Sequence, residues 1–288
     1  MIYEARMFPP VNTKDPVAVE VEVQSAYLAL FSSGDPKFVA RAFGWAVDSF
    51  MGGNPDYLPI DAAYHDLEHT LQGTLCLNQI LRTRQQSGAH PPVPKRLFEL
   101  GILAILLHDT GYLKHRDDTE GTGAKYTATH VQRSAEFAAA LMTAKGYPAL
   151  DILSVRNMIH CTGVDAVMAR IDFQSEAERA VGLALGTADL IGQMAAVDYV
   201  EKLPVLYSEF AEAAKYTKDK ASVVGMFGSA QDLVRKTPTF WEYTKNRLTR
   251  DFGGMYRFLN DPYPFGPNHY LERIEANVER IRQLVSKP

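Results

Sequence analysis

Apolar residues recur at helical spacing along most of this 288-residue chain. The first such stretch opens with the alternating letters VAVEVEV, which also fit a strand, but the continuation QSAYLALF has the helical period. Capping residues and prolines then mark where helices begin and end. We expect helices over residues 17–31, 35–50, 62–84, 95–108, 129–145, 149–160, 175–194, 197–215, 239–251 and 271–285.

This pattern predicts an all-α protein. No hairpin dipeptide lies between alternating runs, and we find neither an internal repeat nor a linker-like segment. We therefore expect one domain over residues 1–288, built as a helical bundle with additional helices in the N-terminal part (1–55) and the C-terminal part (218–288).

Charge and cysteine content narrow the class of protein. The chain carries 30 Lys and Arg against 34 Asp and Glu, a balance that argues against a binder of nucleic-acid polymers. The N-terminal letters lack a signal-peptide pattern, and the longest apolar run, Leu100 to Leu107, is too short to span a membrane. With Cys76 and Cys161 expected to be reduced, we predict a cytoplasmic protein that is not bound to a membrane.

Two histidines, His65 and His69, stand four residues apart, which on a helix places both imidazoles on one face. One interpretation is a pair of solvated histidines. Another is the inverted zinc-protease motif H-x-x-E-H, in which Glu68 would be the base.

Three further residues suggest a metal site. The apolar run LGILAILL ends in His108 and Asp109, and a buried carboxylate at that position needs a partner. Asp189 lies in the apolar stretch ALGTADLIGQM without a neighbouring lysine or arginine. The alternative for Asp189 is a hydrogen bond to a neighbouring hydroxyl such as that of Thr187. Imidazole and carboxylate together suit Fe, Mn, Zn, Ni or Mg.

The order of these residues, H…HD…D on successive helices, resembles the HD superfamily of metal-dependent phosphohydrolases over roughly residues 64–194. The resemblance places the metal-binding core at about residues 60–195. The letters YHDLEHT are also similar to the YHNxxHA signature of class I cyclic-nucleotide phosphodiesterases. The resemblance implies an HD-domain bundle in which the first divalent metal ion is bound by His69, His108, Asp109 and Asp189. It also implies that His65 donates a proton to the leaving alkoxide.

The same resemblance extends to a second metal ion. By analogy with two-metal HD enzymes, Asp109 would bridge the ions, and His130 and His160 would hold the second one. The alternatives are that His130 caps a helix and that His160 interacts with a helix dipole. The chain departs from both phosphodiesterase classes at Tyr112, where class I enzymes have a histidine and HD-GYP enzymes a lysine.

We therefore expect a phosphohydrolase whose catalytic residues are His65 and Asp109 and whose substrate is a small phosphorylated molecule such as a nucleotide or phosphodiester. Two ions would activate a water and neutralise charge on the phosphoryl oxygens. A homodimer is the candidate oligomeric state. Some basic residues near the HD pair are candidates for phosphate contacts, although solvated loop charges are the simpler interpretation: Lys114, His115, Arg116 and Lys125.

Three alternatives remain at this point. A di-iron HD-fold oxygenase that cleaves a C–C or C–P bond would use the same ligands. An inverted zinc protease would leave His108, Asp109 and Asp189 without a role, and a non-enzymatic regulatory HD module would normally have lost ligands.

Overall fold

Helices make up the regular structure of the protein. The computed structural model describes residues 8–217 and 225–286, and within these ranges it contains no β-strand, only an isolated bridge between Tyr57 and His115. The predicted all-α class is thus confirmed. The α-helices in the described ranges are α1 (Pro16–Leu30), α2 (Phe38–Met51), α3 (Leu67–Gln86), α4 (Lys95–Leu107), α5 (His130–Ala144), α6 (Ala149–Ile159), α7 (Glu176–Met194), α8 (Tyr199–Tyr216), α9 (Ala230–Arg250) and α10 (His269–Val285). Short 3₁₀ helices are η1 (Thr110–Tyr112), η2 (Gly123–Tyr126), η3 (Met168–Arg170) and η5 (Met255–Leu259).

Side-chain caps explain where several helices begin. Asp66 accepts a hydrogen bond from the backbone N–H of His69, and Ser175 accepts one from Glu178, so that α3 and α7 start directly after these residues. Each bond satisfies one of the free N–H groups in the first turn of a helix.

Three predicted helix starts near the ends of the bundle are wrong. The helix expected from residue 239 begins at Ala230, because Ser229 caps it and the helix continues through Pro238. The helix expected from residue 35 begins at Phe38, because the side chain of Asp35 bonds to the N–H of Lys37 in a preceding turn. The helix expected from residue 271 begins at His269, because Asn268 caps it by accepting from the N–H of Leu271.

A further correction affects the site. The helix expected over residues 62–84 begins only at Leu67, since Asp66 is its cap. His65 therefore precedes α3, and the helical spacing that we used to pair it with His69 does not apply.

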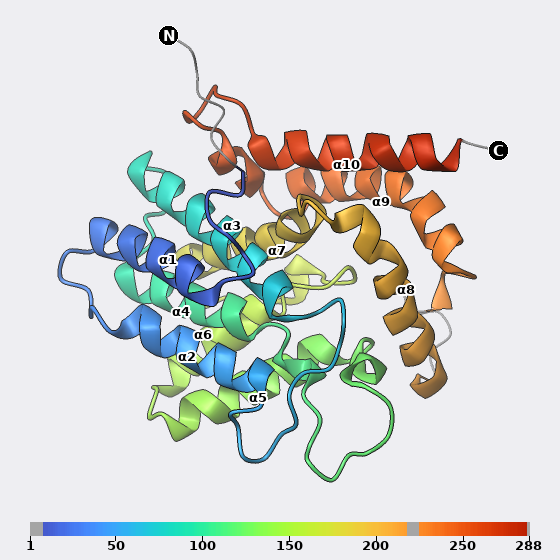
Figure 1. Cartoon of the computed structure of the whole chain (residues 1–288). Coiled ribbons are helices and arrows are strands. Elements are labelled where there is room, and N and C mark those ends of the chain that lie inside the picture. The colour runs from blue at the N-terminus through green and yellow to red at the C-terminus, as the bar shows by residue number, and fades with distance from the viewer. Residues whose placement is uncertain (1–7, 218–224, 287–288) are drawn as a thin grey trace.

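α4 lies at the centre of the bundle, and every residue from Phe98 to Leu107 is buried. α3 and α7 pack closely beside it (Figure 1). Their close approach depends on glycines: a Cβ added to Gly192 would lie 3.0 Å from the backbone nitrogen of Gly73. Three helices that each carry a candidate metal ligand thereby meet in the core.

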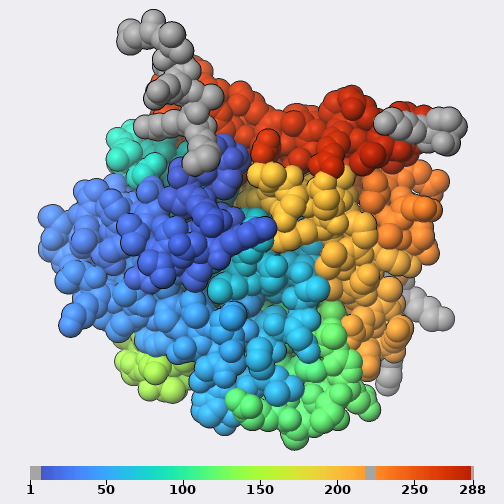
Figure 2. All heavy atoms as spheres, in the orientation of Figure 1, coloured from blue at the N-terminus to red at the C-terminus, as the bar shows by residue number. Residues whose placement is uncertain are grey.

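The remaining helices surround this centre. α9 and α10 lie along one side of the molecule, and α8 runs down the adjacent flank (Figure 1). On the face shown in Figure 2, the cyan segment that leads into α3 reaches the surface between the blue N-terminal helices and the golden α8. One hydrophobic cluster extends from Val19 in α1 to Ile281 in α10.

The predicted domain boundaries stay a prediction. The N-terminal letters 1–7 and the expected boundary at residue 218 lie outside the described residues. Among the helices that the structure describes, none is by itself long and apolar enough to cross a membrane; α7 and α8 pass such a test only as a pair, bent by 110°.

Two helical glycines allow a test of this packing. A Cβ on Gly186 in α7 would lie 2.5 Å from the carbonyl oxygen of Cys161 and 2.4 Å from the ring of Phe252, whereas a Cβ on Gly44 in α2 would meet no atom within 4 Å. We expect Gly186→Ala to lower the free energy of unfolding by about 1–3 kcal/mol. Gly44→Ala should raise it by up to about 1 kcal/mol, because alanine favours helices. Urea denaturation measures both values, and equal effects of the two substitutions would contradict the described packing.

Candidate metal centre

The first histidine of the cluster, His69, lies in the first turn of α3, and its side chain is buried. Because Asp66 caps the helix by accepting from the N–H of His69, the backbone of this residue is fixed at the helix start. Its imidazole Nε2 lies 3.2 Å from Oδ2 of Asp109 and 3.4 Å from Oδ1 of Asp189.

His108 and Asp109 follow the buried helix α4, and each is only 1% exposed. His108 ends the helix, and its Nδ1 donates a hydrogen bond to the carbonyl oxygen of Ile105 over 2.7 Å. In a neutral imidazole this leaves Nε2 with a lone pair, as in many metal-binding histidines. That Nε2 lies 3.2 Å from Oδ2 of Asp109.

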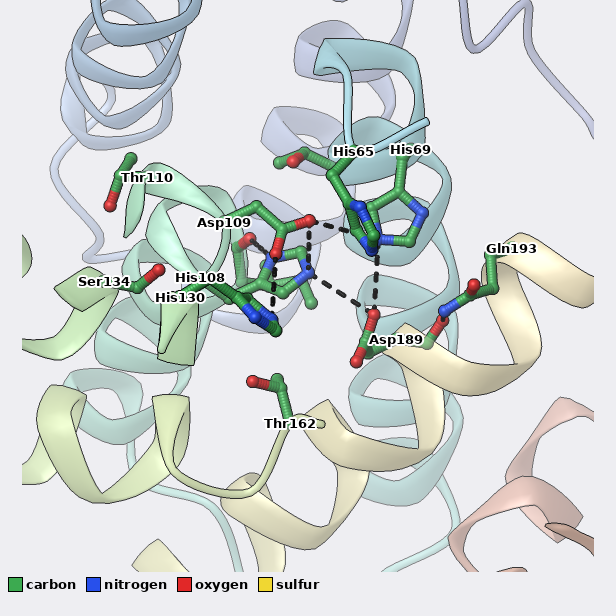
Figure 3. A network of polar contacts seen from close by, with 12 residues as sticks. His65, His69, His108, Asp109, Thr110, His130, Ser134, Thr162, Asp189 and Gln193 are labelled. Atoms are coloured by element: carbon green, nitrogen blue, oxygen red, sulfur yellow. Dashed lines mark hydrogen bonds and ion pairs between the residues drawn. The ribbon is translucent and has the colours of Figure 1, made fainter. Parts of the chain in front are cut away.

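Asp189 completes the cluster from α7. Its Oδ1 lies 3.4 Å from Nε2 of His69 and 3.4 Å from Nε2 of His108. The hydroxyl of Thr187 instead donates to the carbonyl oxygen of Leu183, so it does not supply the alternative partner that we considered for Asp189. Figure 3 shows the four side chains pointing toward one another from three helices.

The donor atoms fit a metal ion. Nitrogen and oxygen ligands lie about 2.0–2.2 Å from a divalent ion, so neighbouring ligand atoms stand about 3.0–3.4 Å apart. The four contacts given above fall in this range. Nε2 of His108 and Oδ2 of Asp109 are buried and have no hydrogen-bond partner among the described residues. Buried polar atoms without a partner are costly, and a bound cation would satisfy them. The group formed by His69, His108 and Asp109 can therefore hold a metal ion.

The electrostatics of the cluster favour binding of a positive charge between its side chains. Burial opposes ionisation of Asp109 and Asp189, but the neighbouring imidazoles outweigh it and lower the pKa of both carboxyls. Burial also lowers the pKa of His69, yet Asp109 and Asp189 outweigh this effect and raise that pKa to about 10. The carboxylates are thus ionised and attract a cation.

His130, the first residue of α5, lies beside the cluster. Its Nδ1 donates to the carbonyl oxygen of Thr127 over 2.6 Å, and its Nε2 lies 3.8 Å from Oδ1 of Asp109, the carboxylate oxygen that does not face His69 and His108. Burial lowers the pKa of His130, which favours the neutral form that metals bind.

His160, the other ligand expected for a second ion, is placed differently. It caps the C-terminus of α6 and is about half-buried, and burial together with Arg156 lowers its pKa. Among the described residues, no ion pair or ring contact joins His160 to the cluster. A second metal site formed by His130 and His160 stays a prediction.

A glutamate on α8 holds His65. The Nδ1 of His65 lies 2.5 Å from Oε2 of Glu209, and Oε1 of Glu209 accepts from the backbone N–H of Tyr64. Glu209 is buried. Burial raises the pKa of its carboxyl, but the neighbouring His65 outweighs this effect, so the pKa is lowered. Sequence reasoning missed Glu209. The signal was its position four residues before Ala213, a spacing that places both buried side chains on the same face of α8.

The protease interpretation receives no support from Glu68. Its carboxylate forms an ion pair with Lys202 at 3.1 Å and accepts a long hydrogen bond from Thr13. A general base would instead have to face the ion.

The basic residues of the loop after Asp109 are engaged locally. Lys114 donates to the carbonyl oxygen of Gly121, Arg116 to that of Pro55, and Lys125 pairs with Asp118. The ring of His115 stacks on that of Tyr57 at 4.5 Å. These contacts match the simpler interpretation, in which the charges belong to the loop.

Comparison with known proteins gives a partial match to one family model and no activity. Residues 116–251, somewhat less than half of the chain, match the model of the Npun_R2479-like family, whose description names no function. The matched range contains His130, His160, Asp189 and Glu209 but not His69 or the His108–Asp109 pair. No curated protein matches the chain.

The cluster predicts metal-dependent stability. With a divalent ion at 100 times its Kd, we expect stabilisation by about 2.7 kcal/mol, or a rise in Tm of roughly 5–10 °C. The rise should vanish in His108→Ala and Asp109→Asn, because each removes a donor atom of the buried group formed by His69, His108 and Asp109. Thermal denaturation with Mn, Fe, Ni, Zn or Mg, together with metal analysis of the purified chain, measures this.

His269→Ala is the matched control for these variants. His269 is an exposed histidine that pairs with Glu272 at the start of α10. The His269→Ala variant should bind as much metal as the unsubstituted protein. Retention of the full metal content by Asp109→Asn would contradict the assignment of the site.

Proposed function

We propose that the protein is a metal-dependent phosphohydrolase of the HD type that acts on a nucleotide or another phosphodiester. One observation carries the proposal: buried donor atoms of His69, His108, Asp109 and Asp189 converge from three helices in the order H…HD…D. The proposal requires one ion at these four residues. A divalent ion held there would supply Lewis-acid activation of water and would offset negative charge on phosphoryl oxygens.

His65 and Glu209 supply the proton-transfer part of the proposal. Because Nδ1 of His65 donates to Oε2 of Glu209, its Nε2 is the nitrogen left to exchange a proton with a substrate. Ring centroids of His65 and His69 lie 5.3 Å apart, so this imidazole borders the ligand cluster. In the protonated form it would donate to the departing oxygen, with the Glu209 carboxylate stabilising the imidazolium.

Asp109 has the second catalytic role in the proposal. One of its oxygens faces His69 and His108, and the other faces His130. Its two oxygens thus connect the four-ligand cluster to the side where His130 lies. Asp109, His130 and His160 are the residues that would hold a second ion, which would supply further positive charge to a phosphoryl group.

A substrate screen tests the proposed reaction. We expect hydrolysis of at least one member of a panel of nucleotides, cyclic nucleotides and generic phosphodiesters when Mn, Fe, Ni or Mg is supplied. Asp109→Ala should lower kcat by at least about 1000-fold, since it removes ligand and charge together. His269→Ala, which alters an exposed histidine remote in sequence from the cluster, should retain activity.

The screen also separates the proposal from the oxygenase alternative. Consumption of oxygen by iron-loaded protein without release of phosphate or alcohol from any phosphoester would sink the phosphohydrolase assignment. Hydrolysis that is unchanged in Asp109→Ala would do the same.

The role of Glu209 gives a separate prediction. Glu209→Gln keeps the size of the side chain but removes the charge that stabilises protonated His65, so we expect kcat to fall by about 100-fold, with KM and metal content unchanged. Glu212→Gln is the matched control. Glu212 lies one turn further along α8 and accepts from the N–H and hydroxyl of Thr122 rather than from His65. Equal losses in both variants would indicate that α8 has only a structural role.

A further inference from the structure

Tyr112 lies beneath both imidazoles that border the ligand cluster. It is the last residue of η1, and its side chain is fully buried. Its ring stacks on that of His65, with centroids 4.7 Å apart, and on that of His130, with centroids 4.9 Å apart. The interplanar angle is 19° in both pairs, so each imidazole lies nearly flat against the tyrosine.

The three centroid distances show on which side the imidazoles lie. The centroids of His65 and His130 are 5.9 Å apart. Two rings stacked on opposite faces of a third would be separated by at least about 7 Å, twice the contact distance of ~3.5 Å between carbon atoms. Both imidazoles therefore rest against the same face of Tyr112.

The turn that carries Tyr112 is docked on the first turn of α5. The backbone N–H of Gly111 donates to the hydroxyl of Ser134 over 2.8 Å, and Nε of Arg133 donates to the carbonyl oxygen of Gly111 over 2.7 Å. A Cβ at Gly111 would lie 2.0 Å from the carbonyl oxygen of His130, so only glycine permits this approach. The tyrosine ring is thereby fixed relative to the helix that supplies His130.

Each imidazole is held in two ways. A hydrogen bond fixes Nδ1, to Glu209 for His65 and to the carbonyl oxygen of Thr127 for His130. A single hydrogen bond still permits the ring to rotate about the bond axis. The flat contact with Tyr112 removes this freedom, and the Nε2 atoms keep one direction.

We propose that Tyr112 is a positioning residue whose ring orients His65 and His130 together beside Asp109. The orientation itself follows from the stacking geometry, while its effect on turnover rests on the function proposed above. The aromatic ring of Tyr112 orients the imidazoles by stacking, and the proposal assigns no role to its hydroxyl.

Tyr112→Phe and Tyr112→Leu form the matched pair of variants. Phenylalanine keeps the ring, and leucine fills much of the volume without an aromatic face. For a hydrolysed substrate we expect Tyr112→Leu to lower kcat about 100-fold with unchanged KM, as for a catalytic group displaced by about 1 Å. Tyr112→Phe should retain kcat, and both variants should retain the metal content, which depends on the four converging ligands.

NMR of the imidazoles provides a readout that does not depend on activity. In the unsubstituted protein and in Tyr112→Phe, we expect nuclear Overhauser contacts from the ring of residue 112 to His65 and His130, and upfield shifts of their ring protons. In Tyr112→Leu the upfield shifts should be lost, and the Nδ1 proton of His65 should exchange faster with water.

These measurements separate the two proposals. If no substrate is hydrolysed, the proposed function fails, and NMR of the unsubstituted protein still decides whether Tyr112 orients both rings, even where the leucine variant does not fold. Absence of contacts to either imidazole would overturn the inference. So would equal loss of kcat in Tyr112→Phe and Tyr112→Leu, which would assign the effect to the hydroxyl, or full kcat in Tyr112→Leu.

Discussion

Two buried carboxylates that contact the same pair of imidazoles set the main constraint on this structure. Asp109 and Asp189 lie in the core, where an ionised carboxylate without compensation is costly. The imidazoles of His69 and His108 approach both of them, so α3, α4 and α7 must cross at one point. The glycines at the contact of α3 and α7 are the sequence feature that lets the helices approach so closely.

Backbone carbonyl groups near the ends of helices determine which nitrogen of His108 and His130 carries the proton. His108 bonds to a carbonyl of the last turn of α4, and His130 bonds to a carbonyl just before α5. Carbonyl groups that lack a helical partner thus select the tautomer of both rings, and Nε2 faces the carboxylates in each case. Backbone geometry, rather than further side chains, prepares these two histidines for a cation.

Local sequence patterns predicted the helices and most of the cluster because periodicity, caps and buried acids are local signals. The apolar run that ends in His108 and Asp109, and the isolated acid at Asp189, pointed to a shared partner before any contact was known.

Distant contacts were not predictable in this way. Glu209 is one of several glutamates in α8, and only the fold brings it to His65, 144 residues away in the chain. His65 itself lies before the helix on which the spacing rule had placed it, because Asp66 is the cap. The sequence marks Tyr112 only as a departure from the resemblance, and the positioning role proposed for it rests on two stacking contacts that only the fold creates.

The contacts of α8 lengthen the shortest stretch of the chain that would contain every residue of the proposed site. Every residue of the four-ligand cluster lies before residue 195, so a fragment that ends there would retain all four donors. It would nevertheless lack Glu209, the hydrogen-bond partner of His65, and Glu212, which holds the loop at Thr122. Under the proposed function, such a fragment would keep the residues for cation binding and lose the partner of the proton-transfer residue. The unit that could perform both extends at least to the end of α8 at Tyr216.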